Sequence, residues 1–205
     1  MNIRLHRGDL PDLSRYQVPA VAVDTEAMGL SPHRDRLCVV QLSPGDGSAD
    51  VVQIAPGEAS APNLTKLLAD AAVLKIFHFA RFDLAVLQNR LGVMPAPVYC
   101  TKIASRLART YTDKHGLKDL ARELLGLDIS KQQQLSDWGA PALTDAQLAY
   151  AASDVLHLHA LKERLDTMLV REARAELAAA CFAFLPDRAR LDLAGWGGED
   201  IFTHS

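Results

Sequence analysis

The sequence has no surplus of positive charge. Lysine and arginine number 22 against 25 aspartates and glutamates, so the formal net charge is -3 at pH 7. Proteins that grip long nucleic-acid duplexes draw much of their affinity from neutralising phosphates, and they usually carry a basic surplus. The overall charge therefore argues against a protein that follows a long polynucleotide by electrostatic attraction.

Cysteine is scarce as well. The three cysteines, Cys38, Cys100 and Cys181, lie far apart and form no CxxC pair, which argues against a zinc cluster or a disulfide framework. The first residues, MNIRLHRGDLPDL, lack the apolar stretch of a signal peptide, and no run approaches the roughly 20 apolar residues of a membrane span. We therefore expect a soluble, cytoplasmic protein with free thiols and no membrane partner.

The apolar content is sufficient for one sizeable core. The 205 residues are 49% hydrophobic and 23% charged, which is typical of a globular domain rather than a disordered or fibrous chain. The turn-rich stretches SPGDGS and PGEASAP are too short to link domains. We predict a single domain over residues 1–205.

Short apolar stretches in the first half are typical of buried strands. We predict strands from Ala20 to Asp24, Leu37 to Leu42, Asp50 to Ile54, and Val73 to Phe77. SPGDGS joins the second of these to the third and indicates a hairpin. The first three strands should therefore pair in meander order.

Helical patterns dominate the rest of the chain. We predict helices from Asn63 to Leu68, Arg81 to Leu91, Lys102 to Ala108, Leu117 to Leu125, and Asp145 to Met168. Asn63 is expected to cap the first helix, and Gly92 to close the second. Thr144 and Gln147 have the spacing of a capping box for the last. This order of elements predicts an α/β three-layer domain with a mixed central sheet flanked by helices.

Two acids, Asp24 and Glu26, end the first predicted strand. Residues two apart on a strand point to the same face, so the two carboxylates should meet there. A divalent cation relieves the repulsion between them, because hard cations bind carboxylate oxygens. The alternative is a solvated turn, which is the more frequent explanation of an isolated DxE.

Two more acids lie on predicted helices. Asp83 is one turn into a helix, where its alternative role is to interact with the helix dipole. Tyr150 and Asp154 are four apart and share a helix face, which is also typical of ordinary packing. Together, four carboxylates can hold two metal ions about 4 Å apart. Such a pair stabilises the attacking and leaving oxygens of a phosphoryl displacement.

The three motifs, in this order, resemble those of the DEDD superfamily of 3′→5′ exonucleases, in its ribonuclease D-like branch. VAVDTE is similar to the first motif, HFARFD to the second, and the span from Tyr150 to Asp154 to the third, YxxxD. Ala149 stands where the sister branch has histidine, so the resemblance is to the tyrosine branch. It implies a ribonuclease H-like fold with a catalytic core at about residues 20–168.

The resemblance also implies a role for each matched residue. Asp24, Glu26 and Asp154 would hold one metal ion, and Asp24 and Asp83 the second. Tyr150 would orient the attacking water and help to remove its proton. Two Mg²⁺ or Mn²⁺ ions are expected, since an all-oxygen site favours hard cations over zinc. The products would be 5′-mononucleotides.

Longer stretches are similar to the bacterial nano-RNase C group, namely RDRLCVVQLSPGDG, CTKIASRLARTYTDKHGLKDL, SKQQQLSDW and GWGGEDIFTHS. This resemblance implies very short RNA, dinucleotides above all, as substrate. It also implies a ring-like homo-oligomer, for which an octamer is expected. Residues 169–205 have room for a helix and a docking tail, and we expect no helical nucleic-acid-binding accessory domain. With the acidic balance, this favours a small substrate.

The predicted substrate-binding residues are Thr25, Leu30, His78, Arg81, Lys131, Gln134 and Ser136. Leu30 would wedge between the two bases, or else it is a core or turn leucine. His78 would contact the sugar or the scissile region, or else it is a buried, hydrogen-bonded histidine. The last three residues would cap the 5′ phosphate, or else they belong to a solvated loop.

Three functions stay open. The first is a dinucleotide-preferring exoribonuclease, the second a general 3′→5′ exonuclease on longer RNA or DNA, and the third an inactive nucleic-acid-binding scaffold. The presence of all four acids and the tyrosine argues against the third. The basic stretch from Arg106 to Lys118 lines a substrate path or a subunit contact, or it is a solvated face. The apolar side chains Trp196, Ile201 and Phe202 are expected to be buried, on the same subunit or on a neighbour.

Overall fold

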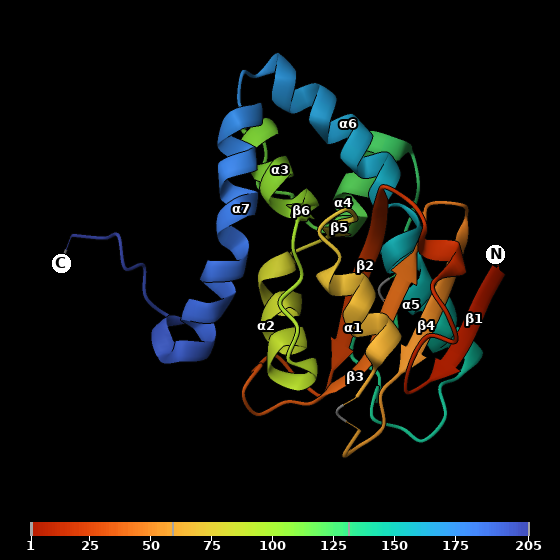
Figure 1. Ribbon diagram of the computed structural model, residues 1–205. Helices are drawn as coiled ribbons and strands as arrows, with labels where there is room; N and C mark the ends of the chain where they lie inside the picture. Colours follow the sequence, from red (N-terminus) through yellow and green to blue (C-terminus); the bar gives the residue numbers. More distant parts are fainter. Residues whose placement is uncertain (1, 59, 131, 205) are drawn as a thin grey trace.

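A six-stranded mixed β-sheet forms the centre of the molecule (Figure 1). The computed structural model describes residues 2–58, 60–130 and 132–204. The strands are β1 (Asn2–Arg7), β2 (Ala20–Ala27), β3 (Leu37–Ser43), β4 (Ser48–Gln53), β5 (Leu74–Phe77) and β6 (Val98–Cys100). Their order across the sheet is β1-β4-β3-β2-β5-β6, so β2, which carries two of the predicted acids, lies inside the sheet.

The predicted meander is confirmed. β3 runs antiparallel to both of its neighbours, β2 and β4, whereas the β1–β4, β2–β5 and β5–β6 pairs are parallel. Every residue of β3 and β4 is buried, including the polar side chains Gln41, Asp50 and Gln53. The hairpin between them uses Gly45 and Gly47, both at positive φ, the backbone region that glycine enters without steric cost.

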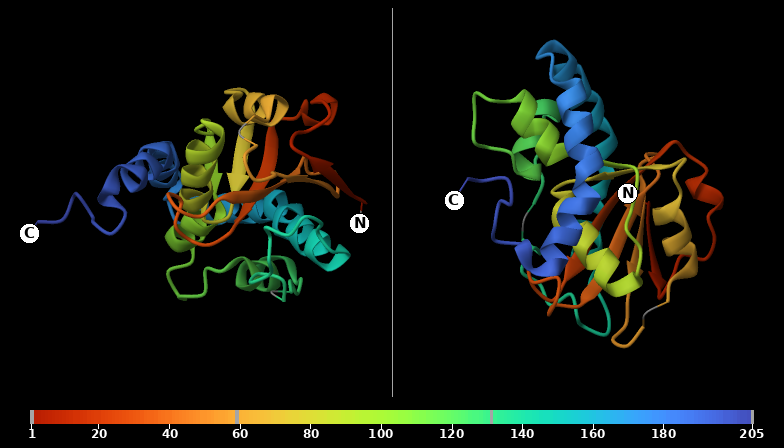
Figure 2. Two further views of the ribbon diagram at one scale, coloured as in Figure 1. Left: turned by 90° about the horizontal axis from the view of Figure 1, so that it is seen from below. Right: turned by 60° about the vertical axis from the view of Figure 1, so that its left-hand side comes forward.

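Helices cover both faces of this sheet. They are α1 (Pro62–Ala69), α2 (Ala80–Leu91), α3 (Thr101–Ala108), α4 (Leu117–Leu120), α5 (Asp145–Leu156), α6 (Leu158–Arg171) and α7 (Ala175–Leu191), with short helical turns η1 (Ser14–Tyr16), η2 (Ala121–Leu125) and η3 (Asp192–Trp196). Figure 2 shows α1 and α2 on one face and α5 on the other. The α/β three-layer prediction is therefore confirmed.

Two strands were missed from the sequence. β1 is an edge strand whose sequence NIRLHR mixes apolar with polar and charged residues, and all six are exposed or half-buried, so it has no apolar run to mark it. β6 has only three residues and follows the cis Ala96–Pro97 bond, and its length is below that of a recognisable pattern. Both strands depend on pairing with a neighbour that is distant in the sequence.

The long predicted helix from Asp145 to Met168 is wrong as a single element. At His157 the backbone (φ -105°, ψ -5°) leaves the helical path and separates α5 from α6. The break lets α5 stay against β2, β3 and β4 while α6 packs on α3. The Thr144–Gln147 capping box at the start of α5 is confirmed.

Asn63 does not cap α1, which begins at Pro62 after Ala61. The carboxylate of Asp9 instead accepts the backbone N–H groups of Asn63 and Leu64, each at 2.8 Å. Two of the free backbone N–H groups at the start of the helix are thus hydrogen-bonded to a residue more than 50 positions away, which sequence spacing cannot reveal. Gly92 closes α2 in the left-handed conformation, as predicted.

The C-terminal part of the chain lies at the β6 edge of the sheet. α7 packs along α2, and the residues after η3 extend away from the body (Figure 1). Within the described residues, none of the helices is long and apolar enough to cross a membrane.

Candidate metal centre and active site

Strand β2 presents Asp24 and Glu26 on the face of the sheet that α5 covers. Alternation along the strand sends Val23 and Thr25 to the opposite face, where Thr25 contacts α2. Both acids are half-buried and line one cavity of about 560 Å³. The predicted same-face arrangement of the two carboxylates therefore exists.

Helix α5 supplies Asp154 and Tyr150, which the four-residue spacing places on one side of the helix. Carboxylate oxygens of Asp24, Glu26 and Asp154 all lie within 4.8 Å of one another. Tyr150 lines the same cavity. The structure thus brings together, from β2 and α5, three acids and the tyrosine that are up to 130 residues apart.

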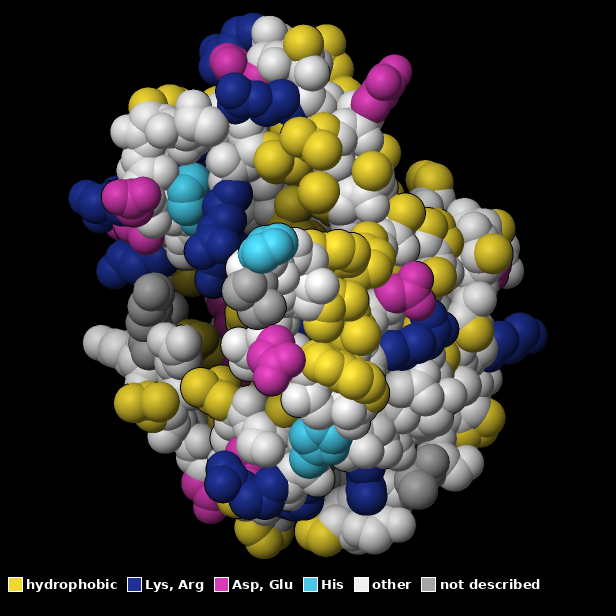
Figure 3. All heavy atoms as spheres, turned by 90° about the vertical axis from the view of Figure 1, so that its left-hand side faces the viewer, with side chains coloured by type: hydrophobic (Ala, Val, Ile, Leu, Met, Phe, Trp, Pro, Cys, Tyr) yellow, Lys and Arg dark blue, Asp and Glu magenta, His cyan; other side chains and the backbone are white. Residues whose placement is uncertain are grey.

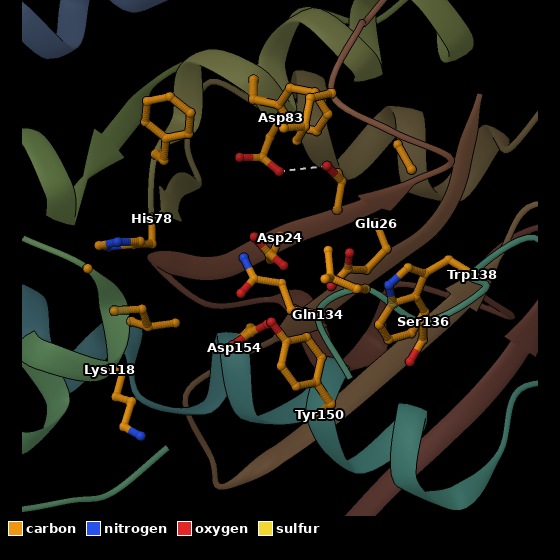
Figure 4. A pocket seen from close by; sticks show the side chains of 18 of the residues that line it. Asp24, Glu26, His78, Asp83, Lys118, Gln134, Ser136, Trp138, Tyr150 and Asp154 are labelled. Atoms are coloured by element: carbon orange, nitrogen blue, oxygen red, sulfur yellow. Dashed lines mark hydrogen bonds between the residues drawn. The ribbon is translucent and has the colours of Figure 1, made fainter. Parts of the chain in front are cut away.

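Asp83 approaches this group from the other side. It lies in the first turn of α2 and is buried, and its Oδ1 accepts a hydrogen bond of 2.6 Å from the Thr25 hydroxyl. Figure 4 shows Asp24 and Glu26 between Asp83 above and Asp154 with Tyr150 below. All four predicted carboxylates and Tyr150 line one cavity.

Mutual repulsion and burial make this cluster costly without a cation. Desolvation by burial, followed by the charges of Asp83 and Asp154, holds the pKa of Asp24 well above its ordinary value. Burial and the neighbouring carboxylates raise the pKa of Glu26 to about 9, and burial raises that of Asp83 to about 7. Such a set of oxygens, crowded and short of positive charge, fits hard divalent cations.

The hydroxyl of Tyr150 stays protonated. Desolvation by burial raises its pKa, and the charges of Asp154, Glu26 and Asp24 act in the same direction. The ring is held by Trp138, whose centroid lies 5.9 Å away. Tyr150 therefore offers a fixed hydroxyl group at the edge of the acid cluster.

Two residues of the site were missed from the sequence. Gln41 on β3 is fully buried, and its Nε2 donates a 2.8 Å hydrogen bond to Oδ2 of Asp24. Trp138 is buried behind Tyr150. The sequence does show Gln41 as a polar residue within the mostly apolar strand LCVVQLS. That it faces Asp24 depends on the register between two strands, which the sequence alone does not give.

The predicted substrate-binding residues divide into three groups. Thr25, Leu30, His78, Gln134 and Ser136 line the cavity. Leu30 is 87% exposed, so the alternative of a core leucine is wrong. His78 is half-buried and lines the cavity, and its Nδ1 lies 2.8 Å from the Thr101 hydroxyl, so its contact with the sugar or the scissile region stays a prediction.

Arg81 does not reach the cavity as the described residues define it. Its guanidinium group binds both carboxylate oxygens of Asp192 at 2.5 and 2.6 Å and also donates to the carbonyl of Gly197. It anchors the segment after α7, and its contact with substrate stays a prediction. Lys131 lies outside the described residues.

The rest of the cavity lining includes lysines and apolar side chains. Lys102 and Lys118 line it, and the Lys102 ammonium lies 4.2 Å from the centre of the Phe79 ring. Phe79 has φ 72°, an uncommon left-handed conformation for a bulky residue, at the turn that starts α2. Within the predicted basic stretch, Lys118 reaches the cavity, whereas Arg109 is buried against Glu123.

Comparison with protein families matches residues 13–170 to a family described as 3'-5' exonuclease. The chain is 39% identical over 171 residues to a ribonuclease D from Gluconacetobacter diazotrophicus, a match that covers 83% of this chain and 43% of that protein. The chain therefore spans less than half of the length of such relatives.

Some solved structures match the chain over its whole length. Brucella melitensis NrnC with bound Mg²⁺ is 62% identical, with a TM-score of 0.97, and the same protein bound to pGG is 63% identical, with a TM-score of 0.98; both matches cover 100% of each chain. The ribonuclease D of Escherichia coli, at 23% identity and a TM-score of 0.80 over 93% of this chain and 51% of that one, shares the fold.

Proposed function

Because the chain belongs to the 3′-5′ exonuclease family, in the ribonuclease D-like group that contains NrnC, we propose that it is a metal-dependent exoribonuclease that hydrolyses dinucleotides to 5′-mononucleotides. The observation that carries the proposal is the convergence of Asp24, Glu26, Asp83, Asp154 and Tyr150 on one cavity. Their chemistry is that of phosphodiester hydrolysis assisted by divalent cations.

The acids divide into two ligand sets. Asp24, Glu26 and Asp154, whose oxygens already lie within 4.8 Å of one another, would hold one divalent cation. Asp24 and Asp83 would hold a second. Mg²⁺ and Mn²⁺ both suit an all-oxygen site, and Mg²⁺ is bound by the similar Brucella protein. When bound, such a pair lowers the pKa of water and stabilises charge on the leaving oxygen.

The remaining groups position the reacting atoms. Tyr150, held against Trp138, presents its hydroxyl beside Asp154 and would orient the attacking water by a hydrogen bond. Thr25 holds Asp83 through the 2.6 Å hydrogen bond to Oδ1. Because these contacts exist before substrate binds, less ordering is needed in the transition state.

The cavity dimensions favour a very small substrate. A volume of about 560 Å³ suits a ligand of small-molecule size, and Gln134, Ser136 and Lys118 contribute polar groups to its lining. Leu30 projects into this space with 87% of its surface exposed, a position suited to a wedge between two bases. The similar Brucella protein was solved with pGG. A general exonuclease on longer RNA or DNA is the second candidate, because the chain is also similar to ribonuclease D proteins and to a DNA polymerase I.

We also propose that the protein forms a homo-oligomer, with a ring of eight subunits as the expected form. We expect a cytoplasmic location. Trp196, Ile201 and Phe202 are 45, 48 and 75% exposed, so their expected burial on the same subunit is not found. Figure 3 shows apolar side chains gathered along the face presented by α7. Leu177 and Phe184 on α7 are exposed, and the Phe184 and Phe202 rings lie 5.9 Å apart. An exposed apolar surface of this kind is typical of a contact between subunits.

The deciding experiment compares RNA lengths. Purified protein with Mn²⁺ is incubated with 5′-labelled RNAs of two to ten nucleotides, and initial rates are compared. We expect the dinucleotide to be cut fastest and Asp24→Ala to abolish hydrolysis while circular dichroism stays unchanged. Equal or faster cleavage of the longer RNAs would favour the second candidate, and full turnover by Asp24→Ala would refute the metal site.

A further inference from the structure

We propose that Gln41 is a positioning residue for the metal centre, which holds Asp24 in the orientation that a divalent cation requires. This inference rests on the proposed function, because it concerns the same carboxylate. Gln41 has no place in the three motifs and is not among the described residues that line the cavity, but it contacts Asp24, which is.

Sheet register places Gln41 next to Asp24. The two residues are direct partners across the antiparallel β2–β3 pair, so their side chains leave the sheet on the same face. Gln41 is fully buried, and its Nε2 donates to Oδ2 of Asp24 at 2.8 Å. The contact is therefore built into the pairing of two interior strands and does not depend on a mobile loop.

The chemistry of an amide suits this task. A carboxylate offers about four lone-pair positions, and one hydrogen bond to Oδ2 fixes its rotation while Oδ1 and part of Oδ2 stay available to cations. The amide is neutral, so it neither repels a cation, as lysine or arginine would, nor adds to the crowding of negative charge described for Asp24, Glu26 and Asp83. Partners of this kind around metal ligands typically change metal affinity by about 10- to 100-fold when they are lost.

Packing alone does not account for a glutamine at this position. The neighbouring residues of β3 are apolar and buried, as in Val39, Val40 and Leu42. Within the part of the chain that the structure describes, the Oε1 of Gln41 is buried and has no hydrogen-bond partner. A buried unsatisfied oxygen destabilises the folded state, so an apolar side chain would suit the strand better. Among the described residues, the hydrogen bond to Asp24 is the interaction of the amide that offsets this cost.

The sheet also supplies a matched control. Gln53 on β4 is a second buried glutamine, and its Oε1 likewise has no partner among the described residues. Its Nε2 donates to the backbone carbonyl of Ala140 at 2.8 Å, not to a carboxylate. Gln41→Met and Gln53→Met therefore make the same chemical change in the same sheet, and only the first removes a hydrogen bond from a proposed metal ligand.

The test measures metal binding directly. Thermal stability is recorded as a function of Mg²⁺ concentration, Mn²⁺ binding is measured by isothermal titration calorimetry, and dinucleotide hydrolysis is followed across the same Mn²⁺ range. For Gln41→Met we expect a metal affinity about tenfold weaker than in the wild type, with much of the lost kcat regained at high Mn²⁺. Gln53→Met should bind metal as the wild type does. If Gln41→Met does not fold, Gln41→Asn, whose amide is one methylene shorter, should show the same weakened titration.

Equal metal affinity of the wild type and Gln41→Met, or an equal loss in Gln53→Met, would overturn the assignment of Gln41 while leaving the proposed function in place. A wild-type protein that neither binds Mn²⁺ nor cuts dinucleotides would overturn both. The two failures are therefore distinguishable in one set of titrations.

Discussion

Replacing Glu26 by glutamine should make the metal-free protein more stable at neutral pH while destroying its proposed activity. In the folded chain, burial and the charges of Asp154 and Asp83 raise the pKa of Glu26 to about 9 from an ordinary 4.5. The folded state therefore holds a proton that the unfolded chain releases. As a result, the free energy of unfolding falls as pH rises from about 4.5 to about 9.

The size of this effect follows from the same values. A pH of 7 lies 2.5 pH units above the ordinary pKa of 4.5. Each pH unit is worth about 1.36 kcal/mol, so the metal-free protein loses at most about 3.4 kcal/mol of its free energy of unfolding. A neutral glutamine cannot titrate, so Glu26→Gln should recover much of this. For a chain of this length, about 3 kcal/mol corresponds to a rise in Tm of about 6 to 12 °C.

The assay is thermal and chemical denaturation in EDTA between pH 5 and pH 8, with the exposed Glu163→Gln as control. The difference between Glu26→Gln and the wild type should grow with pH, and added Mg²⁺ should stabilise the wild type more than the variant. A variant whose Tm shows the wild-type pH dependence, or lies below the wild type at pH 8, would refute the inference that the acids repel one another in the absence of metal.

Four other predictions concern the proposed active site, three of them single side chains and one the metal ions. Tyr150→Phe should lower kcat by about 100-fold or more, with unchanged Mn²⁺ binding by calorimetry; a kcat near that of the wild type would remove Tyr150 from the mechanism. Thr25→Val loses the hydrogen bond to Asp83 and should reduce the free energy of unfolding by about 1 to 3 kcal/mol and lower kcat, as urea denaturation and rate assays will show. Leu30→Ala should raise KM for the dinucleotide with an unchanged Tm, since 87% of the side chain is exposed; an unchanged KM would exclude a wedge. EDTA should abolish hydrolysis and Mn²⁺ should restore it, and activity that survives chelation would contradict a metal-dependent mechanism.

The acids of the site were predictable from sequence because each lies at a recognisable position on its own element. Asp24 and Glu26 follow the apolar run of β2, and Tyr150 and Asp154 share a face of α5. The central strands and the capping box were predictable for the same reason, since their signals are local.

Features that depend on distant partners were not predictable. Gln41 lies beside Asp24 because of the register between β2 and β3. Arg81 pairs with Asp192, which lies 111 residues later in the chain. β1 becomes a strand only when it pairs with β4, and the break at His157 is favoured because α6 packs on α3. The spacing of residues along a sequence does not indicate which distant residues will be in contact.

The distribution of the acids over β2, α2 and α5 has a consequence for how the protein is made. A chain growing on the ribosome contains Asp24, Glu26 and Asp83 long before Asp154, and α5 can dock on the sheet only after residue 156 has been added. Until then Asp24, Glu26 and Asp83 are present, but the set of proposed metal ligands lacks Asp154. If the proposed function holds, incomplete nascent chains lack one of the four acids and should not hydrolyse RNA.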